Sequence, residues 1–349
     1  MRLGLNLGYW GSTGGATPEE NLALVLEAER LGYAVVWVAE AYGADAATVL
    51  AWVAARTTRI GIGSAVFQIP GRTPALTAMT AATLDLLSDG RFRLGLGVSG
   101  PQVSEGWHGV AFDRPLARTR EYVEVVRLAL RRETVAYAGR HVTLPLPDGP
   151  GKALRLAVRP VRAQLPLYLG AVGPRNLALA GEIADGWLAI FFSPEHAQES
   201  VLALRAGGAG TDFDVVPTVP VVIGADVAAC ADAVRAYAAL YVGGMGSREA
   251  NFYNGLATRM GYGEAARRVQ DLYLDRRHEE AAAAVPIAFL DATSLLGPGE
   301  RIAARLPAYA EAGVTTLSVA PYGSTHAERL AAVRVAAEAL DASGLGTSA

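Results

Sequence analysis

The stretch RIGIGSAVFQIPGRTPALTAMTAATLDLLSDGRFRLGLGV, residues 59–98, contains one strand–helix–strand unit. Residues 59–65 form a short apolar run, which is typical of a buried strand. Thr73-Pro74 supplies an N-cap followed by proline at the first helical position, and this helix extends to about Leu87. Ser88-Asp89-Gly90 then turns the chain into a second strand at 91–98. Two buried strands joined by a helix predict parallel pairing.

Similar units occur on both sides of this stretch. The first helix begins with a capping box, Thr17-Pro18-Glu19-Glu20, and stops at Gly32. We expect further strands at residues 2–7, 34–39, 166–171, 186–192, 215–223, 285–290 and 314–319. We expect further helices at 45–56, 117–132, 226–241, 299–312 and 325–340, and after Gly173-Pro174 and Ser193-Pro194-Glu195. Repeated units of this kind predict a parallel sheet with helices outside it.

A doubly wound sheet and a (β/α)8 TIM barrel both fit this alternation. About eight or nine strand candidates in 349 residues favour the barrel. No Gly-x-Gly-x-x-Gly follows the first strand, which disfavours a Rossmann dinucleotide site. We therefore predict one α/β barrel domain over residues 1–349, with insertions near 99–116, 134–165 and 245–281.

Composition excludes several classes of function. Lys+Arg is 31 and Asp+Glu is 34, so the formal net charge of -3 argues against a nucleic-acid or anionic-membrane binder. Cys230 is the one cysteine, and the five histidines lack metal-ligand spacing, so we expect no metal site. The N-terminus resembles no secretory signal and no run of about 18 apolar residues occurs, which predicts a cytoplasmic protein without a membrane span.

Barrel enzymes build their active sites at the C-terminal ends of the strands, and this position selects the candidate residues. The side chains there are mostly aromatic or amide, with few acid/base pairs, which suits a planar aromatic ligand better than hydrolysis. The main candidates are Tyr9, Trp10, Glu40, Tyr42, Ser64, Gln68, Arg72, Ser99, Gln102, Trp107, Phe191 and Phe192. Gly170-Ala171-Val172-Gly173-Pro174-Arg175 also enters a helix, where free N–H groups form an anion site or an ordinary turn.

Several motifs together resemble one superfamily. They are the segments 37–43 (WVAEAYG), 68–74 (QIPGRTP), 94–102 (LGLGVSGPQ), 105–109 (EGWHG), 173–176 (GPRN) and 180–187 (AGEIADGW). The combination resembles the bacterial-luciferase-like superfamily, specifically its actinobacterial coenzyme F420-dependent oxidoreductases, which include methylenetetrahydromethanopterin reductases. The resemblance covers nearly the whole chain and implies a barrel that is often dimeric, so we expect a homodimer.

The resemblance also implies a deazaflavin ring across the strand ends. In this family a non-proline cis peptide backs the ring, and the matching bond is expected at Ser64-Ala65. The Gly173 turn matches the region that receives the phosphate-bearing tail. The cofactor residues so implied are Ser64, Ala65, Gln68, Ser99, Gly100, Gln102, Gly170, Val172, Gly173, Arg175 and Asn176, and those of the substrate pocket are Trp10, Arg72, Trp107, Phe191 and Phe192.

One departure from the family bears on the reaction. Members that oxidise sugar phosphates or alcohols carry Asp-His after the second strand, with the histidine as base, whereas the matching pair here is Glu40-Ala41. We therefore predict an F420H2-dependent reductase that transfers a hydride to a C=C or C=N bond of a small metabolite or modified peptide. Glu40, Tyr9, Tyr42 or water would supply the proton, and Glu40 ranks first.

Several alternatives stay open. In the alternative reading these residues have structural roles only: Glu40 is a hydrogen-bond anchor, Arg72 a surface salt-bridge partner, Trp107 a hydrophobic anchor, and Phe191 and Phe192 core residues. Ser99 and Gln102 are otherwise residues that stabilise their loop. Two alternative functions also stay open: the protein is an FMN-dependent monooxygenase, or it is a non-catalytic protein that carries a flavin or deazaflavin. A Schiff-base aldolase is less favoured because Lys152 lies away from the strand ends.

Overall fold

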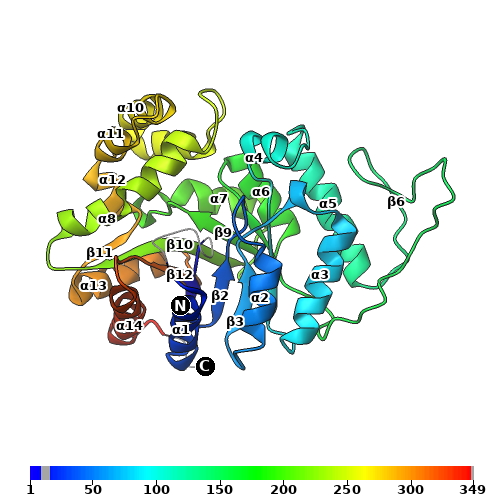
Figure 1. Cartoon of the computed structure of the whole chain (residues 1–349), viewed down its shortest axis with the longest axis horizontal. Coiled ribbons are helices and arrows are strands. Elements are labelled where there is room, and N and C mark those ends of the chain that lie inside the picture. Colours follow the sequence, from blue (N-terminus) through cyan, green and yellow to red (C-terminus); the bar gives the residue numbers. More distant parts are fainter. Residues whose placement is uncertain (9–15, 347–349) are drawn as a thin grey trace.

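A computed structural model describes residues 1–8 and 16–346 of the chain. Among these residues, eight parallel strands form a closed ring, and the pairing of β9 with β10 completes it. Helices surround the ring (Figure 1). In order around the ring, the strands are β1 (Arg2–Asn6), β2 (Val35–Val38), β3 (Gly61–Ser64), β5 (Phe92–Gly97), β8 (Leu167–Gly170), β9 (Gly186–Ile190), β10 (Asp214–Ile223) and β12 (Thr316–Pro321). The predicted (β/α)8 barrel is confirmed.

The helices Pro18–Arg30, Pro74–Leu87 and Pro174–Ile183 begin at the predicted caps. At the predicted start Ser193-Pro194-Glu195 the chain instead forms a short 3-10 helix, and the α-helix begins at Gln198. Thr17 Oγ1 accepts the Glu20 N–H at 3.1 Å and the Glu20 carboxylate accepts the Thr17 N–H at 2.9 Å, which confirms the capping box. None of the described helices is both long and apolar enough to cross a membrane. The outer helices are α1 (Pro18–Arg30), α2 (Ala46–Ala54), α3 (Pro74–Leu87), α5 (Pro115–Leu130), α6 (Pro174–Ile183), α7 (Gln198–Gly207), α8 (Val227–Ala239), α13 (Gly299–Glu311) and α14 (His326–Ser343).

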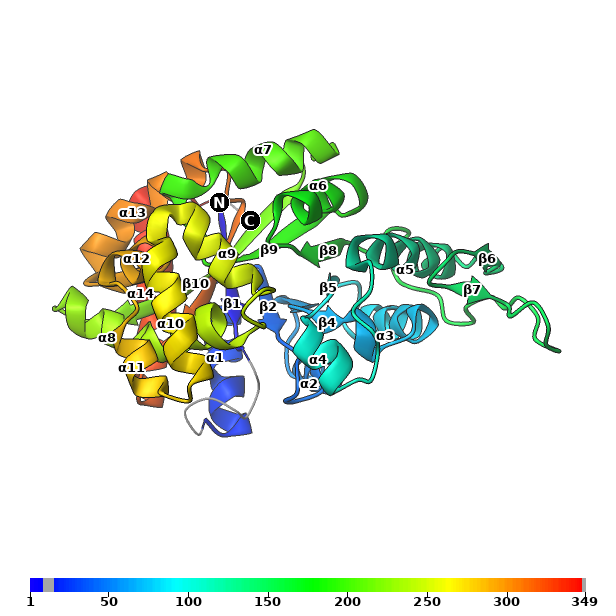
Figure 2. The same cartoon turned by 90° about the horizontal axis from the view of Figure 1, so that it is seen from above.

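The three predicted insertions differ in structure. The first holds the short helix α4 (Pro101–Gly106). The second holds the hairpin strands β6 (Tyr137–Ala138) and β7 (Thr143–Leu144), which project from the body of the protein (Figure 2). The third follows the π-helix η3 (Leu240–Gly244) and comprises α9 (Phe252–Ala257), the π-helix η4 (Thr258–Tyr262), α10 (Gly263–Leu274) and α11 (His278–Ala283).

The predicted strand at 285–290 is wrong. Residues Ile287–Ala292 form the helix α12, with Phe289 and Leu290 buried and Ile287 exposed. The strand in this region is β11 (Leu295–Gly297), which pairs with the last residues of β10. A short apolar run fits a buried helix as well as a strand, and Pro286 favours a helix start. Three short elements complete the chain: β4 (Phe67–Gln68), η1 (Ile69–Gly71) and η2 (Pro194–His196).

Trp37 fills the interior of the barrel and is fully buried there. It packs in a cluster with Val35, Tyr168, Leu188 and Val216, and its ring meets Tyr168 edge-on at a centroid distance of 5.2 Å. The neighbouring strands make room for it with glycine. A Cβ at Gly63 would lie 2.3 Å from the Trp37 ring, and one at Gly95 would lie 1.9 Å from the Ser64 carbonyl oxygen. Gly63 therefore makes room for the Trp37 ring, and Gly95 lets the backbones of β3 and β5 approach each other.

Asp214 ties the N-terminal ends of the strands together. Its buried carboxylate accepts hydrogen bonds from Tyr168 Oη at 3.0 Å and Thr316 Oγ1 at 2.9 Å, and it pairs with Arg2 at 3.2 Å. Burial, reinforced by the charge of Asp214, raises the pKa of Tyr168. These residues come from β10, β8, β12 and β1, so one carboxylate links four strands of the ring. The contacts at this end of the barrel stabilise the fold, and the opposite end is available for an active site.

Gly63→Ala tests whether the Trp37 packing limits stability. The added methyl group would overlap the Trp37 ring, so we expect a loss of about 1–3 kcal/mol in the free energy of unfolding. The measurement is the midpoint of thermal or urea unfolding. Gly106→Ala is the matched control, because a Cβ at Gly106 would meet nothing within 4 Å. Equal midpoints for the two variants would contradict this account of the barrel interior.

Candidate active site

The C-terminal ends of the strands lie beneath the inserted helices. α4, α10 and α11 occupy the top of the view in Figure 1, and Figure 2 looks down on this end of the barrel. We call the region bounded by the strand ends the mouth. Tyr9 and Trp10, both predicted to belong to the mouth, lie outside the described residues.

An apolar shelf forms at the mouth after β3. The cis peptide bond is Ala65–Val66, one residue beyond the predicted Ser64–Ala65 bond. The prediction was off by one because the Ala65 N–H still pairs with the Val38 carbonyl at 2.8 Å, so the ladder with β2 continues past Ser64. The Val66 side chain lies over two glycines: a Cβ would approach it to 2.5 Å at Gly97 and 3.4 Å at Gly170.

Ser64 faces the barrel wall and not the mouth. It is fully buried, and its hydroxyl donates to the Gly95 carbonyl at 2.8 Å and accepts the Gly95 N–H at 2.9 Å. Both hydrogen-bonding functions are therefore used within the sheet. The Ser64 hydroxyl thus links β3 to β5, and the predicted cofactor contact of Ser64 stays a prediction.

Glu40 and Arg72 form a buried ion pair beside the mouth. Arg72 Nη2 donates to Glu40 Oε1 at 2.8 Å, and each side chain is 11% exposed. Glu40 Oε2 accepts the Gln68 N–H at 3.3 Å, and the Arg72 guanidinium also binds Asp45 at 2.5 Å. Burial alone would lower the pKa of Arg72, but the bonds to Glu40 and Asp45 outweigh it and raise this pKa.

These contacts match the anchor alternative for Glu40, and Arg72 does form a salt bridge, but a buried one and not a surface one. The Arg72 guanidinium carbon also lies 4.5 Å from the centre of the Phe67 ring. Arg72 is thus held by β4 and two carboxylates, and its place in the substrate pocket stays a prediction. The proton-donor roles of Glu40, Tyr9 and Tyr42 stay predictions.

Gln68 presents a buried acceptor without a partner. The side chain is 2% exposed, and Nε2 donates to the Ala41 carbonyl at 2.6 Å, which fixes the orientation of the amide. Oε1 is buried and has no hydrogen-bond partner among the described residues. Burying an amide oxygen without a hydrogen-bond donor is energetically unfavourable, so this atom is suited to accept a hydrogen bond from an N–H group of a ligand.

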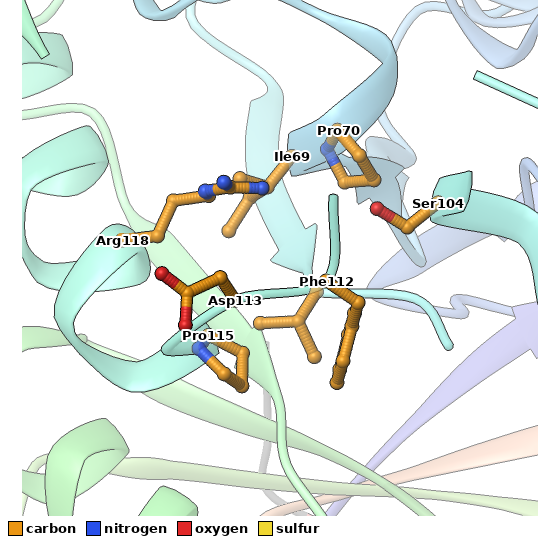
Figure 3. Close-up of a pocket in the computed structure, with 8 residues that line it drawn as sticks. Ile69, Pro70, Ser104, Phe112, Asp113, Pro115 and Arg118 are labelled. Atoms are coloured by element: carbon orange, nitrogen blue, oxygen red, sulfur yellow. The ribbon is translucent and has the colours of Figure 1, made fainter. Parts of the chain in front are cut away.

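The loop after β5 carries further predicted residues. Ser99 has a left-handed backbone with φ of 60°, and Gly100 is the N-cap of α4. Gln102 and Trp107 are exposed, as is Tyr42 after β2. A cavity of about 10 Å³ lies between this loop and η1, lined by Ile69, Pro70, Val98, Ser104, Phe112, Asp113, Pro115 and Arg118 (Figure 3). It has room for at most one water molecule and is too small for a substrate.

The turn between β8 and α6 offers unpaired backbone donors. Gly173 is the N-cap of α6 and provides no side-chain cap. Pro174 has no N–H, and the first intrahelical bond runs from Leu177 N to Gly173 O at 2.9 Å. The N–H groups of Arg175 and Asn176 are therefore directed beyond the helix end, where the helix dipole favours an anion. A Cβ at Gly173 would meet nothing within 4 Å, so this end is open.

Two cationic side chains lie near this turn. Arg175 lines an open groove of about 470 Å³ with Arg120 and Glu182, between α5, α6 and the end of α7. Arg259 comes from η4 in the third insertion, and its Nη2 donates to the Val172 carbonyl at 3.2 Å. Sequence reasoning missed Arg259, because 87 residues separate it from Val172 and no local pattern connects them.

Phe191 and Phe192, just after β9, are buried in hydrophobic clusters, and their predicted place in the substrate pocket stays a prediction. Phe192 packs against Trp187 and Tyr309 at centroid distances of 6.0 Å each. Phe191, with φ of 51°, lies 5.3 Å from the Tyr237 ring and 5.5 Å from the Phe289 ring. Both side chains are 4% exposed. The core-packing alternative describes them because the strand end directs successive side chains into two neighbouring clusters.

The fold and this mouth belong to a recognised class of barrel. Residues 3–316 match the family model described as luciferase-like monooxygenase, and the chain belongs to this family. Over 345 residues the chain is 43% identical to a Mycobacterium tuberculosis protein provisionally named a coenzyme F420-dependent oxidoreductase, with 95% of this chain and 99% of that protein covered.

Two further relatives share a related name. The 5,10-methylenetetrahydromethanopterin reductase of Archaeoglobus fulgidus is 30% identical over 223 residues, which cover 62% of this chain and 64% of that protein. The solved structure of the coenzyme F420 dependent tetrahydromethanopterin reductase from Methanopyrus kandleri matches with a TM-score of 0.80 at 24% identity and covers 97% of both chains. At that identity the structural match establishes the fold.

Glu40→Gln tests the anchor role. The substitution keeps the shape of the side chain but removes the charge that faces Arg72. Arg72 retains Asp45, so we expect a loss of about 1–3 kcal/mol in the free energy of unfolding. The measurement is chemical unfolding of the wild type, Glu40→Gln, Arg72→Met and the double variant. A double variant whose loss equals the sum of the single losses would show that the pair does not interact.

Proposed function

We propose that this protein is a coenzyme F420H2-dependent reductase that delivers a hydride to a C=C or C=N bond of a small metabolite or modified peptide. The observation that carries the proposal is the arrangement of the mouth: an apolar shelf at Val66 adjoins Gly170, and four residues later α6 begins without a side-chain cap. A flat ring with an anionic arm needs these two features side by side. The full-length relative at 43% identity, named for the same coenzyme, supports this choice.

The residues of the mouth fit such a group. Val66 would lie against the ring, because it covers Gly97 and Gly170 at the strand ends. The unpartnered Gln68 Oε1 would accept an N–H from the polar edge of the ring. The amides of Arg175 and Asn176 would receive the arm. When bound, the reduced coenzyme supplies the hydride, and these residues contribute position, worth up to about 7–11 kcal/mol in well-aligned cases.

Reduction is favoured over alcohol oxidation by the residue pair that follows β2, Glu40-Ala41. The carboxylate after β2 is engaged by Arg72 and by the Gln68 N–H, and the next residue is Ala41 where dehydrogenases of the family carry histidine. The histidine that serves as base in those dehydrogenases is thus absent at this position. Reduction needs one proton at the acceptor, and Glu40, Tyr9, Tyr42 or water remain the proposed donors.

An FMN-dependent monooxygenase is the second candidate, since the family model carries that description. Reduced FMN reacts with oxygen whereas the reduced deazaflavin essentially does not, so the two functions separate experimentally. FMN binding with oxygen-dependent turnover, in the absence of deazaflavin binding, would establish the alternative.

Titration with both cofactors tests the proposal. We expect F420 to bind with a micromolar or lower dissociation constant, measured by the absorbance of the deazaflavin. We also expect activated enones or imines to oxidise F420H2 in the absence of oxygen. Gln68→Met removes the free acceptor and is expected to weaken F420 binding about tenfold. Gln198→Met, at an exposed position of α7, is the control. Tight binding without reduction of any acceptor would instead indicate a carrier protein.

We also propose that two copies of the chain associate through α3. Leu76, Met79, Leu86 and Leu87 lie on one face of this helix and are between 44% and 60% exposed. The one charged residue of α3, Asp85, is buried and bonded to Arg162, so the exposed face carries no charge. An uncharged apolar face is self-complementary across a two-fold axis, which favours a second copy as its partner.

Light scattering coupled to size exclusion tests this association. The wild type is expected at twice the 36.4 kDa chain mass and Leu87→Glu at the monomer mass. Leu202→Glu, on α7 and also exposed, should leave the dimer intact. A wild-type protein that elutes as a monomer at micromolar concentration would contradict the proposal.

A further inference from the structure

One side of the barrel interior carries polar side chains at the level of the Trp37 indole. Gly4 of β1 pairs in register with Ser318 of β12, and Ser318 pairs in register with Thr218 of β10. A Cβ at Gly4 would lie 3.3 Å from Trp37 Nε1, so Gly4 faces the interior beside the indole nitrogen. Residues that pair across parallel strands face the same side of the sheet, so Ser318 and Thr218 also point inward. The three strands therefore bring two hydroxyls to the side of the barrel where the indole N–H lies.

These groups have hydrogen-bonding capacity that the described residues do not use. Trp37 is fully buried and Ser318 is 1% exposed, yet within the described part of the chain neither Trp37 Nε1 nor Ser318 Oγ has a hydrogen-bond partner. Thr218 Oγ1 accepts a hydrogen bond from Asn6 Nδ2 at 3.2 Å, which leaves the hydroxyl proton of Thr218 to be donated elsewhere. Unpaired polar groups are unfavourable in an interior, and most buried polar groups in proteins have a protein or water partner.

The chemistry of these groups matches one water molecule. Trp37 Nε1 and Thr218 Oγ1 each offer a proton, and the two lone pairs of a water oxygen can accept both. Ser318 Oγ can accept a proton of the same water. The water would then make three hydrogen bonds, which is the usual number for a water buried in a protein. Small residues surround this place, because Gly4 has no side chain and Ser318 follows it around the ring.

A bound ion fits this place less well than water. The indole N–H directs its proton into the site, which disfavours a metal cation. An anion in the interior requires a positive charge beside it. The guanidinium groups of Arg2 and Arg93 instead lie 3.2 and 3.9 Å from the carboxylate of Asp214, at the N-terminal end of the barrel. A neutral ligand that both donates and accepts hydrogen bonds is therefore favoured.

We propose that a water molecule binds inside the barrel between Trp37 Nε1, Ser318 Oγ and Thr218 Oγ1. The water holds the indole in its orientation, and the same ring occupies the side-chain space of Gly63. It therefore belongs to the packing on which the barrel interior depends. The site involves neither the cofactor nor the hydride acceptor, so it stands or falls independently of the proposed function.

The site is connected to the mouth through Asn6 at the end of β1. Asn6 Nδ2 donates to Thr218, and Asn6 Oδ1 accepts the Gly8 N–H at 2.8 Å. Gly8 is the last described residue before the segment that follows β1. The water thus extends a hydrogen-bonded chain that runs from the barrel interior to the mouth.

A high-resolution crystal structure of the wild-type protein tests the site directly. We expect electron density for one water within hydrogen-bond distance of Trp37 Nε1, Ser318 Oγ and Thr218 Oγ1. An ordered indole and two ordered hydroxyls without such density would overturn the proposal.

The stability of Ser318→Ala tests the same site in solution, because the sign of its effect depends on the water. When water is bound, the substitution removes one of its hydrogen bonds, and we expect the equilibrium constant for unfolding to rise about tenfold in urea titrations. Without bound water, the substitution only removes an unpaired buried hydroxyl, so an unchanged or smaller constant would overturn the proposal. Ser64→Ala is the matched control: its buried hydroxyl is bonded to Gly95, so this variant should be destabilised in either case.

Discussion

The packing of one indole ring into a glycine-lined barrel shapes the rest of this molecule. Trp37 occupies the interior, and Gly63 and Gly95 are small because the ring and the Ser64 carbonyl take up their side-chain space. Glycines also leave space for a side chain at the mouth, where Val66 covers Gly97 and Gly170. The shape of the mouth thus follows from close packing below it, since a dense interior transmits each added methyl group to its neighbours.

The two ends of the barrel divide stability and binding between them. At the N-terminal end, Asp214 joins four strands through Tyr168, Thr316 and Arg2. At the other end, the charged pair Glu40–Arg72 satisfies its own hydrogen bonds and leaves an apolar shelf with one unpaired amide oxygen, that of Gln68. Such a mouth supplies orientation more than acid–base catalysis, and it suits a cofactor that carries the reactive electrons itself.

Local signals predicted the elements whose cause is local. The capping box at Thr17, the Thr73-Pro74 start of α3 and the turn at Gly90 lie where the sequence placed them, because caps and turns depend on a few adjacent residues. The prediction of a strand at 285–290 failed because short apolar runs occur in buried helices as well as in buried strands. The contacts of Ser64 and Phe192 could not be predicted for another reason: which way a residue at a strand end faces depends on partners such as Gly95 and Tyr309.

The amino-acid sequence by itself determined the alternation of strands and helices, the closed barrel, and the family to which the chain belongs. Periodicity, caps and motifs depend on residues that are close in the chain, so they can be recognised from the sequence alone. The tertiary structure decided which side chains meet at the mouth: Arg72 with Glu40, the acceptor of Gln68 left without a donor, and Arg259 beside Val172. Contacts of this kind join residues tens of positions apart, and closure of the barrel and docking of the insertion bring them together.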